Sequence, residues 1–313
     1  MRALITGIEG FVGGYLADEL INNNLDVYGT YFDERTLEDE LMKKAKLYSM
    51  DITNDKQVEK TIQEIQPDYI FHLAAQSSAG ISWQKPQQTM TININGTINL
   101  LEAIRKLKIQ SRVILIGSSE EYGIVKESEN PISEEQELRP GNPYSVSKIT
   151  QEKLAELYTN AYGMDIVMTR SFNHTGPKQQ PAFVISDFAK RIVEIEHGSI
   201  EPILHVGNLE ARRDFLDVRD VVKAYYIIAL KGLKGEVYNV GSGKSYSIQE
   251  LLNYMLDKSS IKIDVQKDLK RMRPSDNPVI QCDNQKLRRL GWSPMININQ
   301  TIDDVLAYWE KRM

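Results

Sequence analysis

Short runs of β-branched and other apolar residues recur through the first half of the chain, and longer segments of helical period separate them. Such alternation predicts right-handed βαβ units, whose strands form one parallel sheet with helices on both faces. We therefore expect an α/β fold built on a doubly wound parallel sheet. The expected strands contain residues 3–5, 27–28, 69–71, 113–116 and 166–168.

The pattern becomes less regular after about residue 175. Helical segments near 183–196 and 218–231 are separated there by charged connections, and no Gly/Ser-rich or Pro-rich linker marks a boundary. A length of 313 residues suits one large or two smaller units, at about 150 residues each. We expect a first domain over 1–175, to which 217–245 return, and a smaller C-terminal α/β domain made mainly of 176–313.

Composition excludes several classes of protein. The net charge is -5, from 38 basic and 43 acidic side chains, which disfavours a nucleic-acid partner. The longest apolar stretches, such as 224–230, are far shorter than the roughly 20 residues that span a bilayer, so no membrane association is expected. A single cysteine, Cys282, excludes an intrachain disulfide, and we expect a cytoplasmic protein.

A glycine-rich turn follows the first expected strand directly and opens a helix. Glycines in this position let the backbone turn sharply and approach a pyrophosphate, whose charge the helix N-terminus then holds. Placement between a strand and a helix at the start of the chain indicates a Rossmann-type dinucleotide site. The residues expected to bind the cofactor here are Gly7, Gly10, Phe11, Val12 and Gly13.

The second strand leaves the choice of cofactor open. A carboxylate at its end would bind the adenosine ribose and select NAD, but Thr30 and Tyr31 stand there instead. Asp33 and Glu34 follow a little later, and Arg35 could face a 2′-phosphate. Both NADP(H) and NAD(H) remain candidates, with NADP(H) or dual use favoured. After the third strand, Asp51 and Ile52 are expected near the adenine, although a turn residue is the simpler explanation of Asp51.

Three residue types form a candidate catalytic group. Tyr144 and Lys148 are four positions apart on a helix expected over 144–161, so both side chains emerge on one face. Ser118 follows the strand at 113–116, and the carboxyl ends of parallel strands are where such sheets bind ligands. A nearby ammonium lowers the pKa of a phenol, and a serine hydroxyl can stabilise a developing alkoxide. A surface Tyr–Lys pair and a turn-capping serine are the alternatives. The apolar stripe expected along this helix contains Val146, Ile149, Leu154, Leu157 and Ala161.

Together with these groups, several motifs resemble the nucleotide-sugar branch of the extended short-chain dehydrogenase/reductase family. They are His72-Leu73-Ala74-Ala75, Asn142-Pro143-Tyr144, 170–177, 207–209, 212–215, 238–243 and 271–274. The resemblance covers nearly the whole chain and implies a nucleoside diphosphate sugar bound between two domains. It adds Leu73, Ala74, Ala75 and Phe172 to the expected cofactor site, together with Tyr144 and Lys148. The residues it implies for the substrate are Gln76, Ser119, Asn173, Val184, Asn208, Arg213, Arg273 and Asp276.

Within that branch, residues 172–177, 183–185 and 213–218 are most similar to the GDP-4-keto-6-deoxy-D-mannose reductases, which form GDP-D-rhamnose. The resemblance implies reduction of the C4 ketone, with Tyr144 as proton donor and Ser118 orienting the oxygen. Glu120 keeps a 4,6-dehydratase as the alternative, because elimination needs a carboxylate base near the sugar. An epimerase is the third possibility, and a dinucleotide-binding protein without turnover is the most remote.

Other features have simpler explanations. The run at 241–245 resembles the end of a P-loop, but Tyr238 stands where the first glycine belongs. We therefore expect a strand-to-helix turn that leads to a helix start, where Ser247 and Glu250 form a capping box. The histidines show no metal-ligand spacing, and no metal is expected. The helix that contains Met90, Ile94, Ile98 and Leu101 is most simply part of the core. The resemblance also implies a homodimer formed by this helix and the helix that begins at Tyr144.

Overall fold

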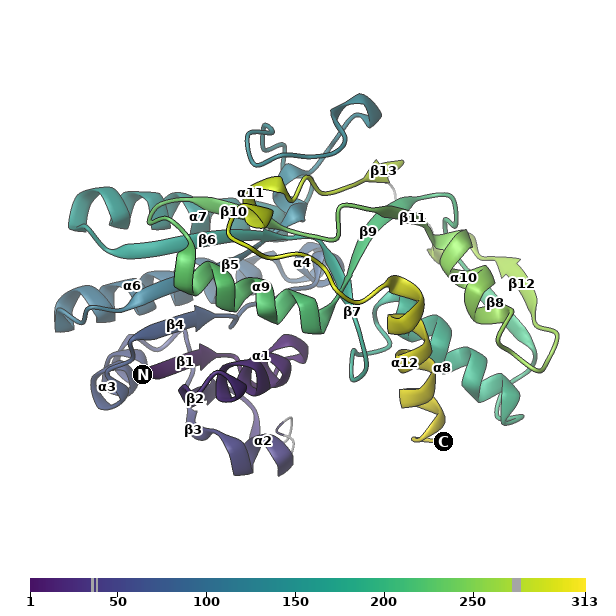
Figure 1. Cartoon of the computed structure of the whole chain (residues 1–313), viewed down its shortest axis with the longest axis horizontal. Helices are drawn as coiled ribbons and strands as arrows, with labels where there is room; N and C mark the ends of the chain where they lie inside the picture. The colour runs from purple at the N-terminus through teal and green to yellow at the C-terminus, as the bar shows by residue number, and fades with distance from the viewer. Residues whose placement is uncertain (35–36, 38, 272–276) are drawn as a thin grey trace.

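The computed structural model describes residues 1–34, 37, 39–271 and 277–313. A seven-stranded parallel sheet forms its larger part, with the order β10-β6-β5-β4-β1-β2-β3 (Figure 1). The strands are β1 (Arg2–Thr6), β2 (Asp26–Tyr31), β3 (Lys46–Ser49), β4 (Tyr69–His72), β5 (Arg112–Ser118), β6 (Asp165–Ser171) and β10 (Val237–Val240). The predicted doubly wound parallel sheet is therefore confirmed.

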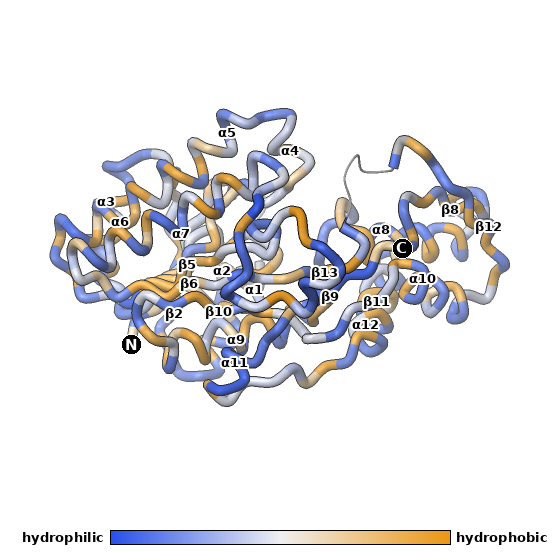
Figure 2. Tube along the Cα trace, turned by 90° about the horizontal axis from the view of Figure 1, so that it is seen from above, coloured by the Kyte–Doolittle hydropathy of each residue, from blue (hydrophilic) through white to orange (hydrophobic). Residues whose placement is uncertain are grey.

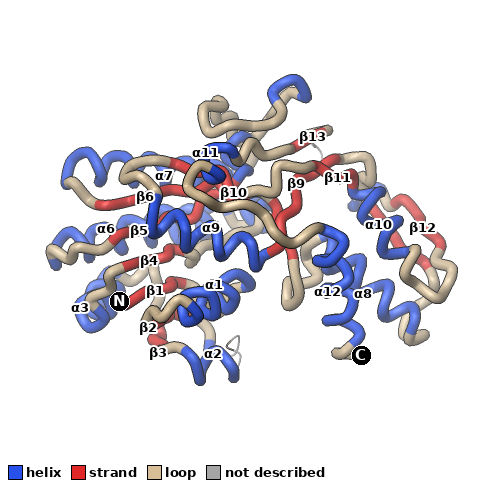
Figure 3. Tube along the Cα trace, viewed as in Figure 1, coloured by secondary structure: helices blue, strands red, loops and turns tan. Residues whose placement is uncertain are grey.

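Helices cover both faces of this sheet (Figure 3). Their bounds are α1 (Phe11–Asn22), α2 (Asp39–Lys44), α3 (Asp55–Ile65), α4 (Ala79–Gln84), α5 (Pro86–Met90), α6 (Gly96–Leu107), α7 (Pro143–Tyr162) and α9 (Val218–Lys231). A π-helix, Thr91–Asn95, joins α5 to α6, so the single helix expected around Ile94 is divided into three segments.

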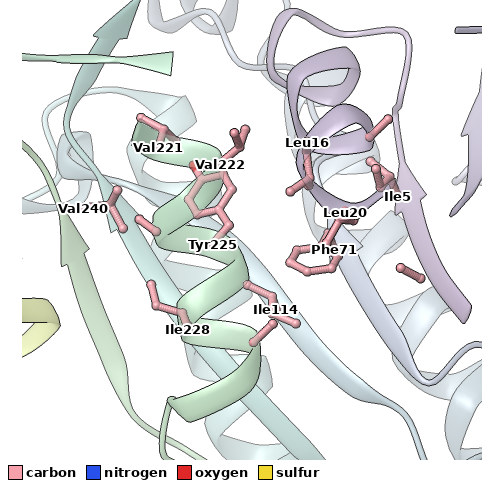
Figure 4. Packing of buried hydrophobic residues seen from close by; sticks show 14 of the residues in the cluster. Ile5, Leu16, Leu20, Phe71, Ile114, Val221, Val222, Tyr225, Ile228 and Val240 are labelled. Atoms are coloured by element: carbon pink, nitrogen blue, oxygen red, sulfur yellow. The ribbon is translucent and has the colours of Figure 1, made fainter. Parts of the chain in front are cut away.

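Alternation along the buried strands divides the core into two layers. Ile5 and Phe71 point toward α1 and α9, whose packing is shown in Figure 4, whereas Leu4 and Ile70 point toward α3 and α6. Successive residues of a strand face opposite sides, so both sides of a parallel sheet need apolar residues. Figure 2 shows the resulting concentration of hydrophobic segments along the central strands.

The apolar stripe predicted along α7 is wrong. Val146 and Leu157 are 40% and 63% exposed, and the buried face instead carries Tyr144, Lys148 and Glu152. This face packs against β5 and β6, where Arg170 of β6 pairs with Glu152 at 2.6 Å. A polar network therefore replaces apolar packing along the face that adjoins the site. The helix itself is confirmed, with Asn142 as its N-cap and Gly163 as its left-handed C-cap.

The chain beyond β6 builds a smaller part around a separate apolar core formed mainly by α8, α10, α12 and β8. Its elements are β7 (Asn173–Thr175), α8 (Val184–Glu196), β8 (Ile203–Val206), β9 (Arg212–Asp217), β11 (Ser245–Ser247), α10 (Ile248–Leu256), β12 (Asp264–Lys267), β13 (Val279–Ile280) and α12 (Ile298–Glu310). The short helix α11 (Gln285–Arg288) packs instead on β10 of the large sheet. Short 3-10 turns occur at Ser119–Tyr122, Glu127–Glu129 and Leu269–Arg271. The capping box predicted at Ser247 and Glu250 is confirmed at the start of α10.

Two small sheets organise this part. β9 is the centre of one of them, and it pairs with β7, β11 and β13, while β8 and β12 form a separate parallel pair. The chain then re-enters the large sheet, because α9 packs on α1 and β10 pairs with β6. No helix within the described ranges has the length and apolar character needed to cross a membrane.

Candidate active site

A large cleft opens at the carboxyl ends of the parallel strands, between the large sheet and the smaller part. It encloses about 2250 Å³, more than twice the roughly 1,000 Å³ of a large drug-sized site, so two nucleotides can fit end to end. β1 and β4 are neighbours from which the chain winds in opposite directions, and ligands bind at such switch points. The predicted site residues that line the cleft are Gly7, Gly10, Phe11, Val12, Gly13, Thr30, Tyr31, Asp51, Ile52, Leu73, Ala74, Ala75, Gln76, Ser118, Ser119, Glu120, Tyr144, Lys148, Phe172, Asn173, Val184, Asn208 and Arg213.

The glycine-rich turn has the geometry of an anion cradle. A Cβ on Gly13 would lie 2.2 Å from the carbonyl oxygen of Ile8, and Gly7 has a φ of +70° close against Ala74. Gly10 is the N-cap of α1 and offers no side-chain cap, and the first turn contains no acidic residue. The N–H groups of this helix end are therefore open to an anion, which fits a dinucleotide pyrophosphate.

The end of β2 has a carboxylate that comes from another segment. Glu9, in the glycine-rich turn, accepts a hydrogen bond from the Phe32 N–H at 2.9 Å through Oε1, while its buried Oε2 has no partner. Thr30 is buried at the strand end and offers only a hydroxyl. Asp51 accepts from both the N–H and the hydroxyl of Thr53, as a turn residue does. Arg35 lies outside the described residues.

The three candidate catalytic side chains meet at one point on the cleft wall. Ser118 ends β5, and its hydroxyl lies near enough to the phenol of Tyr144 from α7 to influence its pKa. Lys148 lies one helical turn further, with Nζ 5.8 Å from the centre of the Tyr144 ring. Its ammonium donates to the Ile116 carbonyl at 2.8 Å. The Ser118 hydroxyl also accepts from the Glu120 N–H, so it caps the following turn as well.

Burial dominates the proton affinities of this group. It raises the pKa of the Tyr144 phenol well above its ordinary value, and the Ser118 hydroxyl only partly opposes this effect. Burial lowers the pKa of Lys148 to about 8, against the opposing effect of the Glu121 carboxylate. The expected lowering of the phenol pKa by Lys148 is therefore absent in the protein alone. A phenol held protonated is the form that a proton donor needs.

The turn after Ser118 places two acidic side chains differently. Glu120 lines the cleft and accepts from the Asn142 side-chain amide at 2.9 Å. Glu121, its neighbour in the sequence, is completely buried and accepts from the Ser118 N–H at 2.7 Å. The turn is a capping box, a short-range motif in which the third residue of a helix reaches back to the cap.

The predicted substrate residues surround the far half of the cleft. Asn173 belongs to β7 and Val184 to the first turn of α8. The Asn208 side chain accepts from the Glu210 N–H at 3.0 Å, and Arg213 donates to the Asn277 carbonyl at 2.7 Å. The Gln76 side chain bonds to Ser78 in its own loop and donates to the Thr89 hydroxyl of α5 at 2.9 Å. Arg273 and Asp276 lie outside the described residues.

Sequence reasoning missed several polar groups that support the site. Asn93, in the π-helix, is fully buried and joins the Gln76 backbone to the Ser147 hydroxyl at 2.8 Å. Asp214 is also fully buried, and its carboxylate accepts from the N–H groups of Ser242 and Gly243. The amides of the P-loop-like run therefore bind a carboxylate rather than a phosphate. Neither Asn93 nor Asp214 carried a local signal, because their partners are distant in sequence.

His72 is a titratable side chain with a structural role. Its ring bonds to the hydroxyl of Thr6 at 2.8 Å and to that of Thr97 at 3.1 Å. Burial, with the charge of Lys148, lowers the pKa of His72 to about 3 and keeps the ring neutral. No three His, Cys, Asp or Glu side chains come together as metal ligands in the part of the chain that the structure describes.

Comparisons with known proteins identify the family of this chain. Residues 4–305 match the model of the GDP-mannose 4,6 dehydratase family. GDP-6-deoxy-D-mannose reductase of Pseudomonas aeruginosa is 36% identical over 248 residues, covering 79% of this chain and 82% of that protein. GDP-mannose 4,6-dehydratase of Vibrio cholerae is 26% identical over 342 residues, covering 96% and 91%.

A solved structure has the same fold over its full length. The structure of RMD from Pseudomonas aeruginosa complexed with NADPH has a TM-score of 0.89 and 32% sequence identity, and the match covers 100% of this chain and 99% of that one. The match includes both the large sheet and the smaller part. The chain therefore belongs to the GDP-mannose 4,6 dehydratase family, whose fold is that of the extended short-chain dehydrogenases/reductases.

Proposed function

We propose that the protein uses NAD(P)H to reduce the C4 ketone of GDP-4-keto-6-deoxy-D-mannose to GDP-D-rhamnose. The grouping of Ser118, Tyr144 and Lys148 on the wall of the cleft carries this proposal. The relative named GDP-6-deoxy-D-mannose reductase supports the reaction type, and the NADPH complex of RMD supports the cofactor class.

The roles of the side chains follow from their chemistry. A bound nicotinamide supplies hydride to the ketone carbon. The Ser118 hydroxyl orients the ketone oxygen, where negative charge develops, and a fixed donor at that point lowers the barrier. Tyr144 delivers its proton to the same oxygen, and the Lys148 ammonium stabilises the phenolate that remains. The open N-terminus of α1 and the bare glycine turn hold the dinucleotide pyrophosphate.

The proposal is tested by offering purified protein two substrates. With GDP-4-keto-6-deoxy-D-mannose and NADPH or NADH, we expect one cofactor oxidised for each sugar reduced, followed as loss of absorbance at the reduced nicotinamide. With GDP-mannose and a catalytic amount of oxidised cofactor, we expect no keto-sugar. Keto-sugar formation in the second assay, without consumption in the first, would contradict the proposal.

A 4,6-dehydratase is the second candidate, and one observation favours it. The Glu120 carboxylate lines the cleft beside Ser118 and is oriented by the Asn142 amide, so a base is available near the sugar. If the protein dehydrates GDP-mannose, Glu120→Gln should abolish that activity because the proton acceptor is lost. The same variant would retain reduction of the keto-sugar, since that reaction requires no carboxylate base.

The Glu9 carboxylate is expected to disfavour a phosphate on the adenosine ribose. Glu9→Gln should raise the ratio of kcat/KM with NADPH to that with NADH by about tenfold, because a like charge near the 2′-position is removed. Steady-state kinetics with both cofactors measure this ratio. Glu19→Gln, on α1 but outside the cleft lining, removes the same charge and should leave the ratio unchanged. An equal ratio in Glu9→Gln and the parent would exclude Glu9 from cofactor selection.

Further parts of the proposal follow from the family resemblance. We place the dinucleotide in the domain of residues 1–175 with 217–245, and the GDP-sugar mainly against 176–313. We also propose a homodimer, with the exposed Val146 and Leu157 of α7 in its interface, and a cytoplasmic location.

A further inference from the structure

A buried carboxyl group that the proposed reaction does not use lies directly behind Ser118. Glu121 is 0% exposed, and its Oε1 accepts the Ser118 N–H at 2.7 Å. The same oxygen lies 2.5 Å from the position that a Cβ on Gly117 would take, so the strand end is shaped around it. Its second oxygen, Oε2, is buried without a hydrogen-bond partner. Isolated carboxylates are rarely buried in this way, since desolvation is costly.

Glu121 and its nearest cation, Arg170, do not form an isolated ion pair. Arg170 Nε lies 3.9 Å from Glu121 Oε2, but the Arg170 Nη2 and Nε atoms donate to the Glu152 carboxylate at 2.6 and 2.9 Å. One guanidinium therefore faces two buried carboxylates. Lys148 is the second buried cation of the cluster, and it interacts electrostatically with Glu121.

We propose that Glu121 is a positioning residue of the catalytic centre. Its carboxyl group fixes the main chain of Ser118, and its ionised form supplies a buried negative charge opposite the Lys148 ammonium. The idea rests on the proposed reduction, in which Ser118 and Lys148 both act. Glu121 does not line the cleft and acts through these two groups.

The surrounding groups determine how this pair titrates. Burial and the Glu152 carboxylate raise the pKa of Glu121 to about 8, while Arg170, Lys148 and the Ser118 N–H oppose the rise. From the other side, Glu121 counters the lowering of the Lys148 pKa by burial. Glu120, Tyr144 and His72 are further titratable neighbours of this turn and of Lys148. The ionised form of Glu121 raises the pKa of Lys148, so removal of this ionisable group lowers that pKa.

Two variants separate the effect of the Glu121 charge from the effect of its hydrogen bond with the Ser118 N–H. Glu121→Gln keeps an acceptor for the Ser118 N–H and removes the charge, whereas Glu121→Asp keeps the charge and withdraws the acceptor. We expect Glu121→Gln to lower the titration midpoint of Lys148 by about one pH unit, and the alkaline limb of kcat to move with it. We expect Glu121→Asp to keep the midpoint and to lower kcat about tenfold with little change in KM.

The Lys148 titration is read from the Nζ resonance of ¹⁵N-lysine-labelled protein, assigned with Lys148→Arg, in the absence of cofactor and substrate. This readout tests the pairing even if the protein reduces no keto-sugar. Glu134→Gln is the matched control, because Glu134 is a partly buried carboxyl that bonds the Asn239 N–H instead. An unchanged midpoint in Glu121→Gln, or a shift as large in Glu134→Gln, would overturn the electrostatic role. If Glu121→Asp had the kcat of the parent protein, the proposed positioning of Ser118 would be overturned. This variant also tests the proposal if Glu121→Gln does not fold.

Discussion

Tyr144→Phe is expected to lower kcat by roughly 10²–10⁴-fold while NAD(P)H still binds with nearly parental affinity. The substitution removes one hydroxyl, and with it both the transferable proton and the polar neighbour of the Ser118 hydroxyl. The ring and its contact with Lys148 remain, so the cleft wall keeps its shape. Single-turnover kinetics of reduction and nicotinamide fluorescence titrations measure the two quantities separately.

Tyr122→Phe provides the matched control. Its hydroxyl is also buried and hydrogen-bonded, to Asn239 at 2.6 Å, but it does not line the cleft. We expect this variant to lose about 1–3 kcal/mol of stability and to keep its turnover. Comparable turnover in Tyr144→Phe and the parent would remove the phenol from the mechanism.

Arg170→Leu is expected to cost about 3–5 kcal/mol of unfolding free energy, because it leaves the buried Glu152 carboxylate without its ion-pair partner and removes the cation nearest to Glu121. Arg170 also donates to the Tyr122 hydroxyl at 3.1 Å and to the Glu134 carbonyl at 2.9 Å, and these acceptors lose their donor as well. Urea unfolding at pH 7 measures the loss. The loss should shrink at pH 5, because an unpaired buried carboxyl has a raised pKa and binds a proton there, which removes the buried charge.

Two comparisons make this prediction specific. Arg105→Leu removes an exposed helical pair with Glu102 and should destabilise the protein far less. Adding Glu152→Leu to Arg170→Leu should recover part of the stability, because it removes one of the stranded charges. If Arg105→Leu and Arg170→Leu were equally destabilised, the buried cluster would have no special energetic role.

The sequence predicted what local chemistry determines. The strands, the glycine turn and the α10 capping box each depend on residues within a few positions of one another. The proximity of Ser118 to Tyr144 also follows from simple rules. Ser118 ends β5, Tyr144 lies at the start of the helix that leads into β6, and the carboxyl ends of the parallel neighbours β5 and β6 lie at one edge of the sheet. These features could be read from spacing alone.

Long-range pairing determined the rest. The buried face of α7 carries Glu152, which pairs with Arg170, a residue outside the helix, so apolar periodicity predicted the wrong face. Glu121 was indistinguishable in the sequence from its cleft-lining neighbour Glu120, although one is fully buried. The role of Asp214 depends on a loop 28 residues later. Such charged core residues contradict the hydrophobic pattern, and they cluster where this site is built.

The route of the chain between the two halves restricts how such an enzyme can be altered. A cut near residue 175 would leave β6 without its neighbour β10, and α1 without the helix α9 that covers it. Neither half can be transferred to another protein as one continuous segment of chain. Changes of sugar preference in proteins of this shape should therefore arise by point substitution or loop replacement within a retained scaffold, not by recombination of whole halves.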